Sequence, residues 1–210
     1  NLEKIAKDKS IQTILSSKKA LKQAKAIGKG KINQTSSVAF FLLYCAWPAC
    51  FYFSYIHCAS ILKNDFGYTA PEIIKQNFFV SIVQCVGYLF FSLLSYYIHP
   101  LKIIRFKGLI FTPFFIICPY LLYAIHDGIY LFGIQSFVIF FGLTAAPAMP
   151  IFIKTFPVFK RFTYTGFIYA LTRALMYITT SFGLVYLTEM AGHWGLYGIM
   201  LPSSIAFLWG

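Results

Sequence analysis

The sequence predicts an all-α membrane protein, a polytopic bundle of six transmembrane helices. Three observations lead to this fold class. The chain of 210 residues is 59% hydrophobic and only 11% charged, far from the composition of an average soluble domain. Several unbroken apolar runs approach or exceed the roughly 20 residues that an α-helix needs to cross a bilayer. The basic residues gather at the amino-terminal end and in every second connection between the apolar runs.

Residues 1–36 form a basic segment that precedes the first apolar run. It contains nine lysines but only two acids, Glu3 and Asp8. Apolar residues recur at near-helical spacing over Ile11–Ala26, which is consistent with a weak amphipathic helix on an anionic membrane surface. The alternative is a solvated linker that only sets orientation. Because the net charge of +12 is concentrated here and in short connections, we expect no nucleic-acid partner.

Residues 37–210 are expected to form the six-span bundle, with a lipid bilayer as its surroundings. Pro48 should kink the first span, because proline removes a helix hydrogen bond. Thr69, followed by Glu72, is typical of a capped helix start before the second span. The expected spans are Val38–Leu62, Ile73–Ile98, Gly108–Ile125, Ile129–Phe152, Tyr164–Glu189, and Trp194 to the end of the chain.

The connections alternate in charge along the chain. Connections 99–107 and 154–161 each carry +3, whereas 63–72 has no net positive charge and 126–128 and 189–193 carry no lysine or arginine. Basic connections stay on the cytoplasmic side of a membrane. We therefore expect the amino-terminal segment in the cytoplasm and a multi-pass protein of the cytoplasmic (inner) cell membrane.

No pattern typical of an enzyme is found in the sequence. It contains no GxSxG turn, HExxH helix, phosphate-binding loop or helically spaced pair of carboxylates. The five cysteines lie inside apolar runs without a CxxC pair, as small buried residues do rather than metal ligands. We therefore expect no catalytic activity, no metal site and no cofactor.

The fifth span contains an arginine, Arg173, near its middle. A charge at that depth costs roughly 2.5–3.5 kcal/mol on insertion scales, so it normally faces a partner or a watery cavity. Two polar stripes follow helical spacing. The second span carries Asn77, Ser81, Gln84, Tyr88 and Ser95, and the fifth carries Tyr169, Arg173, Tyr177 and Thr180. From them we expect a substrate-binding wall made of Arg173, Gln84, Asn77, Tyr169 and Tyr177.

Two alternatives remain open for these residues. The stripes can serve interhelical hydrogen bonding alone, and Arg173 can be a structural cation bonded to backbone carbonyls beside a kinked helix such as that at Pro147. In a binding wall, Arg173 would neutralise an anionic group such as a carboxylate. His57, near the outer end of the first span, is either a titrating group or an interfacial side chain.

The connection after the fourth span, Phe156-Pro157-Val158-Phe159-Lys160-Arg161 followed by Gly166, resembles a loop of the major facilitator superfamily. It is similar to the loop between spans ten and eleven in the metabolite:proton symporter group, which includes proline/betaine, osmolyte and carboxylate carriers. The resemblance implies the C-terminal six-helix half of a twelve-helix carrier, with residues 1–36 as the tail of its central loop. Spans one, two, four and five would line the cavity, and spans three and six would face lipid.

The resemblance implies alternating access, in which two six-helix halves rock about a central site. The expected function is secondary transport of a small polar solute, an osmolyte, amino acid or organic acid, coupled to an ion such as a proton. The expected partner is an N-terminal six-helix half. A second hypothesis is a non-transporting membrane remnant or structural subunit from a split gene, and a third is an oligomeric channel.

Overall fold

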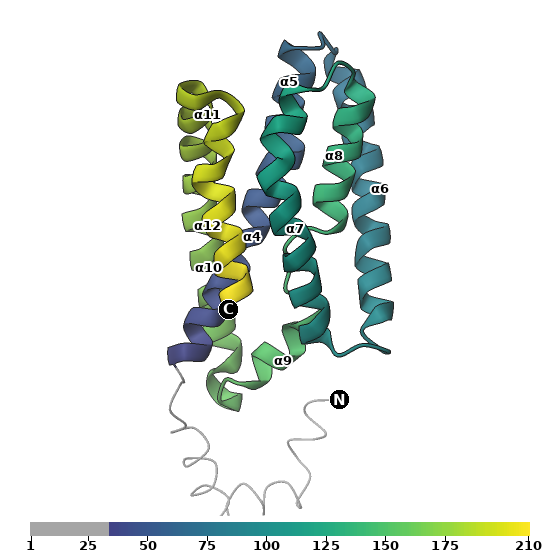
Figure 1. Ribbon diagram of the computed structural model, residues 1–210. Helices are drawn as coiled ribbons and strands as arrows, with labels where there is room; N and C mark the ends of the chain where they lie inside the picture. Colours follow the sequence, from purple (N-terminus) through teal and green to yellow (C-terminus); the bar gives the residue numbers. More distant parts are fainter. Residues whose placement is uncertain (1–33) are drawn as a thin grey trace, which may run out of the picture.

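The structure is a computed structural model that describes residues 34–210. The amphipathic helix expected over Ile11–Ala26 lies outside the described residues. All secondary structure of the described chain is helical, and Figure 1 shows its long helices running side by side. The elements are α4 (Gln34–Tyr52), η1 (Phe53–His57), α5 (Cys58–Asn64), α6 (Ala70–Leu94), α7 (Pro100–Tyr123), α8 (Gly128–Phe140), η2 (Ala146–Ala148), α9 (Met149–Lys154), α10 (Val158–Ile178), η3 (Thr179–Leu184), α11 (Val185–Ala191), η4 (Gly192–Leu196) and α12 (Tyr197–Trp209).

Three helical stretches of the described chain are long and apolar enough to cross a membrane. They are Gln34–Asn64, Ala70–Leu94 and Lys160–Trp209, the last of which includes the turn at Gly192, and α8 is a shorter apolar helix. The fold class of an all-helical protein with membrane-length helices is therefore confirmed. The number of six crossings stays a prediction.

Helix α6 begins at its predicted cap, whereas α7 begins at Pro100, eight residues before the expected start of the third span at Gly108. Helix α6 starts one residue after Thr69, whose backbone N–H and hydroxyl both donate to Glu72 Oε2, at 2.8 and 2.7 Å. This confirms the predicted cap. The first span continues as helix through Pro48 to Asn64, with a π-helical turn, η1, inserted at Phe53–His57.

The connections collect at two ends of the bundle. In Figure 1, the turns after α5, between α7 and α8, and after α11 lie at one end, and those before α7 and after α9 lie at the other. Of the six acidic residues in the sequence, Glu3 and Asp8 lie outside the described part, and the other four lie at or near the first end: Asp65, Glu72, Asp127 and Glu189. The basic connections 99–107 and 154–161 lie at the second end. The connections that alternate in charge along the chain therefore separate in space, with the acidic residues at the first end of the bundle and the basic connections at the second.

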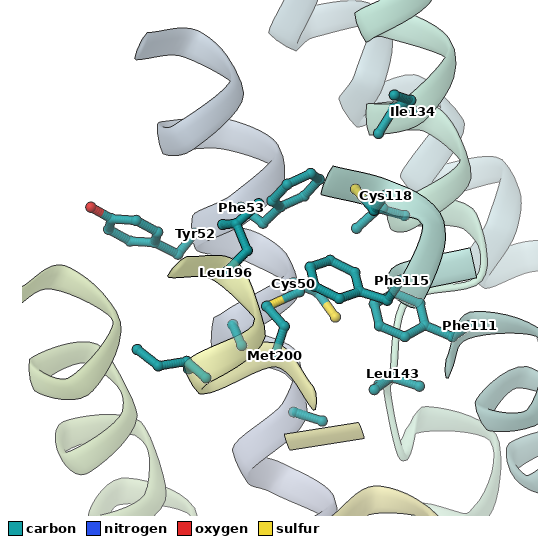
Figure 2. Close-up of a cluster of buried hydrophobic side chains, with 14 of the residues drawn as sticks. Cys50, Tyr52, Phe53, Phe111, Phe115, Cys118, Ile134, Leu143, Leu196 and Met200 are labelled. Atoms are coloured by element: carbon teal, nitrogen blue, oxygen red, sulfur yellow. The ribbon is translucent and has the colours of Figure 1, made fainter. Parts of the chain in front are cut away.

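The core forms where α4 and η1 meet α7 and α12. Figure 2 shows Phe53 and Phe115 facing each other in this cluster, with ring centroids 5.6 Å apart. Phe111 stacks on Phe115 at 5.7 Å, and Leu196 and Met200 close the cluster from the η4–α12 side. Because lipid tails are as apolar as leucine, such helices associate through close van der Waals packing. Four of the five cysteines are buried and free, as expected for structural residues, whereas Cys85 is exposed.

The predicted fourth span, Ile129–Phe152, is not one continuous helix. Helix α8 ends at Phe140, residues 141–145 are irregular, and η2 and α9 follow. Pro147 and Pro150 lack the N–H that a continuous helix would need there. At Gly142 a Cβ atom would lie 2.9 Å from Val138 O and 3.1 Å from Trp47, so the chain approaches α4 too closely for a side chain.

Lys107 was expected in the basic connection 99–107, but the structure buries it. Its side chain is 2% exposed, and its Nζ lies 4.5 Å from the centre of the Phe91 ring. Helix α7 begins at Pro100, so Lys107 lies two turns inside the helix rather than in a loop. The Phe91 ring packs in turn on Phe140 and Phe141, at the end of α8 where helical carbonyls lose their partners. The burial of Lys107 thus accompanies the break in the fourth segment.

Candidate functional site

The polar stripe of α6 turns toward α4 and η1. Tyr55, in η1, donates a hydrogen bond from its hydroxyl to Gln84 Oε1 at 2.8 Å and lies 3.0 Å from Ser81 Oγ. Ser81 also donates to the backbone oxygen of Asn77 at 2.9 Å. The Oδ1 atom of Asn77 is buried without a hydrogen-bond partner in the described part of the chain. The predicted face therefore exists, and its partner is a tyrosine of the first helical stretch.

The polar stripe of α10 centres on Arg173. Its Nη1 donates to the Tyr177 hydroxyl at 3.3 Å. The guanidinium carbon lies 5.1 Å from the centre of the Tyr169 ring and 6.0 Å from that of Tyr177, within the range of cation–π attraction. Nε is buried and has no hydrogen-bond partner among residues 34–210. Arg173 is therefore held by Tyr177 through Nη1, while its Nε–H is a buried donor that no described group satisfies.

A cavity of about 200 Å³ lies between α4, α6, α10 and the broken fourth segment. It brings both stripes together, because Tyr88 of α6 and Arg173 of α10 line the same space. Trp47 of α4 lies between them, with its ring 6.0 Å from that of Tyr88. The full lining is Leu43, Tyr44, Trp47, Tyr88, Thr144, Ala145, Ala146, Met149, Tyr169 and Arg173.

The irregular backbone at 141–145 reaches this cavity. Thr144, Ala145 and Ala146 line it, and the Thr144 hydroxyl accepts a hydrogen bond from the Ala146 N–H at 3.0 Å. Non-helical backbone at membrane depth is tolerated where it is buried in protein or lines a water-filled cavity. In transporters, interrupted helices of this kind mark substrate sites. The break and the arginine therefore belong to one site.

The structure brings together only part of the predicted wall. Arg173 and Tyr169 line the cavity, and Tyr177 holds the Arg173 guanidinium from one turn away. Gln84 and Asn77 do not line it. Gln84 accepts its hydrogen bond from Tyr55. It does not contact Arg173, although the two residues were expected to lie side by side.

Three aromatic residues complete the wall in their place: Tyr44, Trp47 and Tyr88. Tyr44 packs edge-on against Tyr169 with ring centroids 5.4 Å apart and donates its hydroxyl to Met149 Sδ. Tyr88 belongs to the α6 stripe and could have been chosen from its spacing alone. Tyr44 and Trp47 are less regular in the sequence, and only the packing of α4 against α10 identifies them.

In the described part of the chain, Arg173 makes no hydrogen bond to the backbone carbonyls beside Pro147, which was the alternative expectation. Among the described residues its hydrogen bond goes to the Tyr177 hydroxyl, although Ala146, next to Pro147, lines the same cavity. Interhelical hydrogen bonding accounts well for Tyr55, Ser81 and Gln84. It does not account for Arg173, whose one bond is made within its own helix.

His57 lies in a second polar cavity of about 230 Å³ at the acidic end of the bundle. Its ring is perpendicular to that of His193, with centroids 5.9 Å apart, and its Nε2 is buried with no partner in the described chain. The backbone N–H of His193 donates to the Tyr123 hydroxyl at 3.2 Å. No cluster of three or more His, Cys, Asp or Glu able to hold a metal occurs among the described residues.

Comparison with known proteins adds no family to this geometry. Neither protein-family models, nor curated proteins, nor solved structures give a match to the chain.

Proposed function

We propose that this chain is the C-terminal six-helix half of a secondary transporter that moves a small polar solute by alternating access. The solute would be an osmolyte, an amino acid or an organic acid, and transport would be coupled to an ion such as a proton. The protein would lie in the cytoplasmic cell membrane with residues 1–36 in the cytoplasm. A further six-helix half would complete it.

The observation that carries this proposal is the cavity at Arg173. An intramembrane arginine with an unpartnered Nε–H, several aromatic side chains and an interrupted helix meet in one place. The arginine and the interrupted helix each have an energetic cost in a bilayer, and a site for a polar solute is a use that accounts for both.

The exposure of α6 and α10 supports a missing partner half. Both helices leave large apolar side chains uncovered along most of their length, such as Phe78, Leu89 and Phe167 at 62, 61 and 64% exposed. In the proposed carrier these faces would meet lipid on one side and the N-terminal half on the other. The expectation that the third and sixth spans face lipid remains part of the proposal, because within the described bundle α7 and α12 also supply core residues.

The test is uptake by cells that express the complete natural reading frame. A screen of amino acids, betaines and organic acids identifies the solute, and Arg173→Ala should then abolish its uptake while membrane insertion stays normal. Leu171→Ala is the matched control, since Leu171 lies on the same helix, is 40% exposed and does not line the cavity. Uptake by the Arg173→Ala variant at the parent rate would remove Arg173 from the site.

The second candidate is a non-transporting remnant or structural subunit from a split gene. The open faces of α6 and α10 would also suit a helix that only docks against another membrane protein. A continuous reading frame upstream that encodes six more spans would favour the carrier, whereas a stop codon or frameshift there would favour the remnant or a two-piece carrier.

A further inference from the structure

We infer that the Arg173 cavity selects a small organic monoanion with a flat apolar body, such as an aromatic carboxylate, over zwitterions, cations and polyols. This inference rests on the cavity proposed above as the solute site. It narrows the solute class, and it can fail while the transport proposal stands.

The positive charge of the cavity comes from Arg173, whose Nε–H is unpartnered among the described residues. Nη1 is taken by the Tyr177 hydroxyl, while Nε is buried and has no partner among the described residues. On a guanidinium, the Nε–H and one Nη2–H point the same way and match the two oxygens of a carboxylate. A carboxylate bound at this edge would satisfy the unpartnered buried donor.

The surroundings of Arg173 disfavour a second, positive group on the same ligand. The four acidic residues of the described chain lie at or near the connections at one end of the bundle, and none lines the cavity. An ammonium bound in the same small cavity as the guanidinium would be repelled by it, because like charges at close range interact strongly away from bulk water. The guanidinium already lies over one face of the Tyr169 ring and one face of the Tyr177 ring.

The rest of the wall is apolar or aromatic. Four of the ten lining residues carry rings, namely Tyr44, Trp47, Tyr88 and Tyr169, and Leu43 and Met149 are among the others. The Tyr44 hydroxyl is engaged by Met149 and that of Thr144 by a backbone N–H. A polyol would therefore bury hydroxyls with too few partners, which costs binding free energy. A flat ring would instead pack against the aromatic side chains.

The size of the cavity fits such a ligand. At about 200 Å³ it is smaller than the roughly 300–1,000 Å³ of pockets that hold drug-sized molecules. A dry protein cavity of about 150 Å³ is sufficient to bind benzene. A single ring with one carboxylate is therefore the scale of solute that the space accommodates.

Binding can be measured through Trp47, which lies in the cavity wall, on the purified full-length protein in nanodiscs. In a background in which every other tryptophan, including Trp194 and Trp209, is replaced by Phe, benzoate should change the Trp47 fluorescence saturably. Acetate carries the charge without the ring, benzamide the ring without the charge, and benzamidine the ring with the opposite charge. Each should bind at least tenfold more weakly than benzoate, as should L-proline and glycine betaine.

Two variants separate the contributions of charge and ring. Arg173→Gln should weaken benzoate at least tenfold and remove its preference over benzamide, whereas Leu171→Ala should leave both unchanged. Tyr88→Leu should reduce the ratio of the acetate dissociation constant to the benzoate dissociation constant, because it removes one ring of the wall. Stronger binding of proline or betaine than of benzoate would overturn the inference, as would no saturable response to any ligand. In either case Arg173-dependent uptake of another solute would leave the transport proposal intact.

Discussion

Gln135→Leu should destabilise the bundle by about 1–3 kcal/mol through the loss of one buried amide. Gln135 is 0% exposed, and its Nε2 donates to the backbone oxygen of Ser54 at 2.7 Å. Its Oε1 accepts from Gln76 Nε2, also at 2.7 Å. The Ser54 carbonyl lies in the π-helical turn η1, where the Cys58 N–H bonds to Phe53 O instead of to Ser54 O. The amide of Gln135 therefore replaces a helical hydrogen bond that the wider turn gives up.

The magnitude follows from the two bonds that are lost. Leaving a buried carbonyl unsatisfied costs about 1–3 kcal/mol. Interhelical hydrogen bonds in membrane bundles average about 0.6 kcal/mol with a maximum near 1.7, because the unfolded chain also finds partners. The loss of the Ser54 bond should dominate. Gln76→Leu removes only the second bond and should cost roughly 0.5 kcal/mol.

Equilibrium unfolding in mixed micelles with rising SDS, followed by tryptophan fluorescence, gives the free energy of unfolding for each variant. Ser136→Ala is the matched control, because Ser136 is the next residue and its buried Oγ has no partner in the described chain. That variant should lie within about 0.5 kcal/mol of the parent. If Gln135→Leu unfolds at the same SDS fraction as Ser136→Ala, the assignment of Gln135 as the partner of the π-helical carbonyl is wrong.

Three further predictions concern other parts of the bundle. Lys107→Met should leave the free energy of unfolding unchanged or raise it by about 1–2 kcal/mol in the same assay, because it removes a 2%-exposed cation with no acid beside it among the described residues and keeps the packing volume. A clear loss of stability would show that the cation–π contact outweighs the desolvation cost. Gly195→Ala should lower expression and stability, because the added Cβ would lie 2.2 Å from Leu187 O. Gly166→Ala should be tolerated, because its Cβ would have no atom within 4 Å. Equal stability of the two variants would contradict the close approach at η4. A cysteine introduced as Asp65→Cys should react with a membrane-impermeant maleimide added to intact cells, and labelling only after lysis would reverse the predicted orientation.

The parts of the fold that depend on local chemistry could be predicted from the sequence. The apolar runs placed the helical stretches, and the Thr69–Glu72 pair placed the start of α6 to within one residue. Both rest on interactions inside one segment, namely partition into an apolar phase and capping of the first turn. The basic and acidic connections likewise indicated which ends of the helices lie together in Figure 1.

The break in the fourth segment could be predicted only in part. Pro147 and Pro150 signal an interruption, but α8 already ends at Phe140, seven residues before the first proline. The close approach of Gly142 to Trp47 is a tertiary contact between segments almost a hundred residues apart. A single sequence gives no information on such a contact. The burial of Lys107 was missed for the same reason, because its position before an apolar run is typical of a loop cation.

The candidate site shows where periodicity stops being informative. Helical spacing identified residues that share a helix face. It also made the Arg173–Tyr177 contact predictable, because residues four apart are neighbours on a helix. Spacing could not say which faces meet. Both stripes turn toward the first helical stretch, Gln34–Asn64. Gln84 therefore bonds to Tyr55 of η1, and Arg173 shares its cavity with Tyr44 and Trp47 of α4. The irregular polar residues of the first helical stretch therefore matter more than their spacing suggested: α4 contacts both stripes, and a change in α4 would alter both at once.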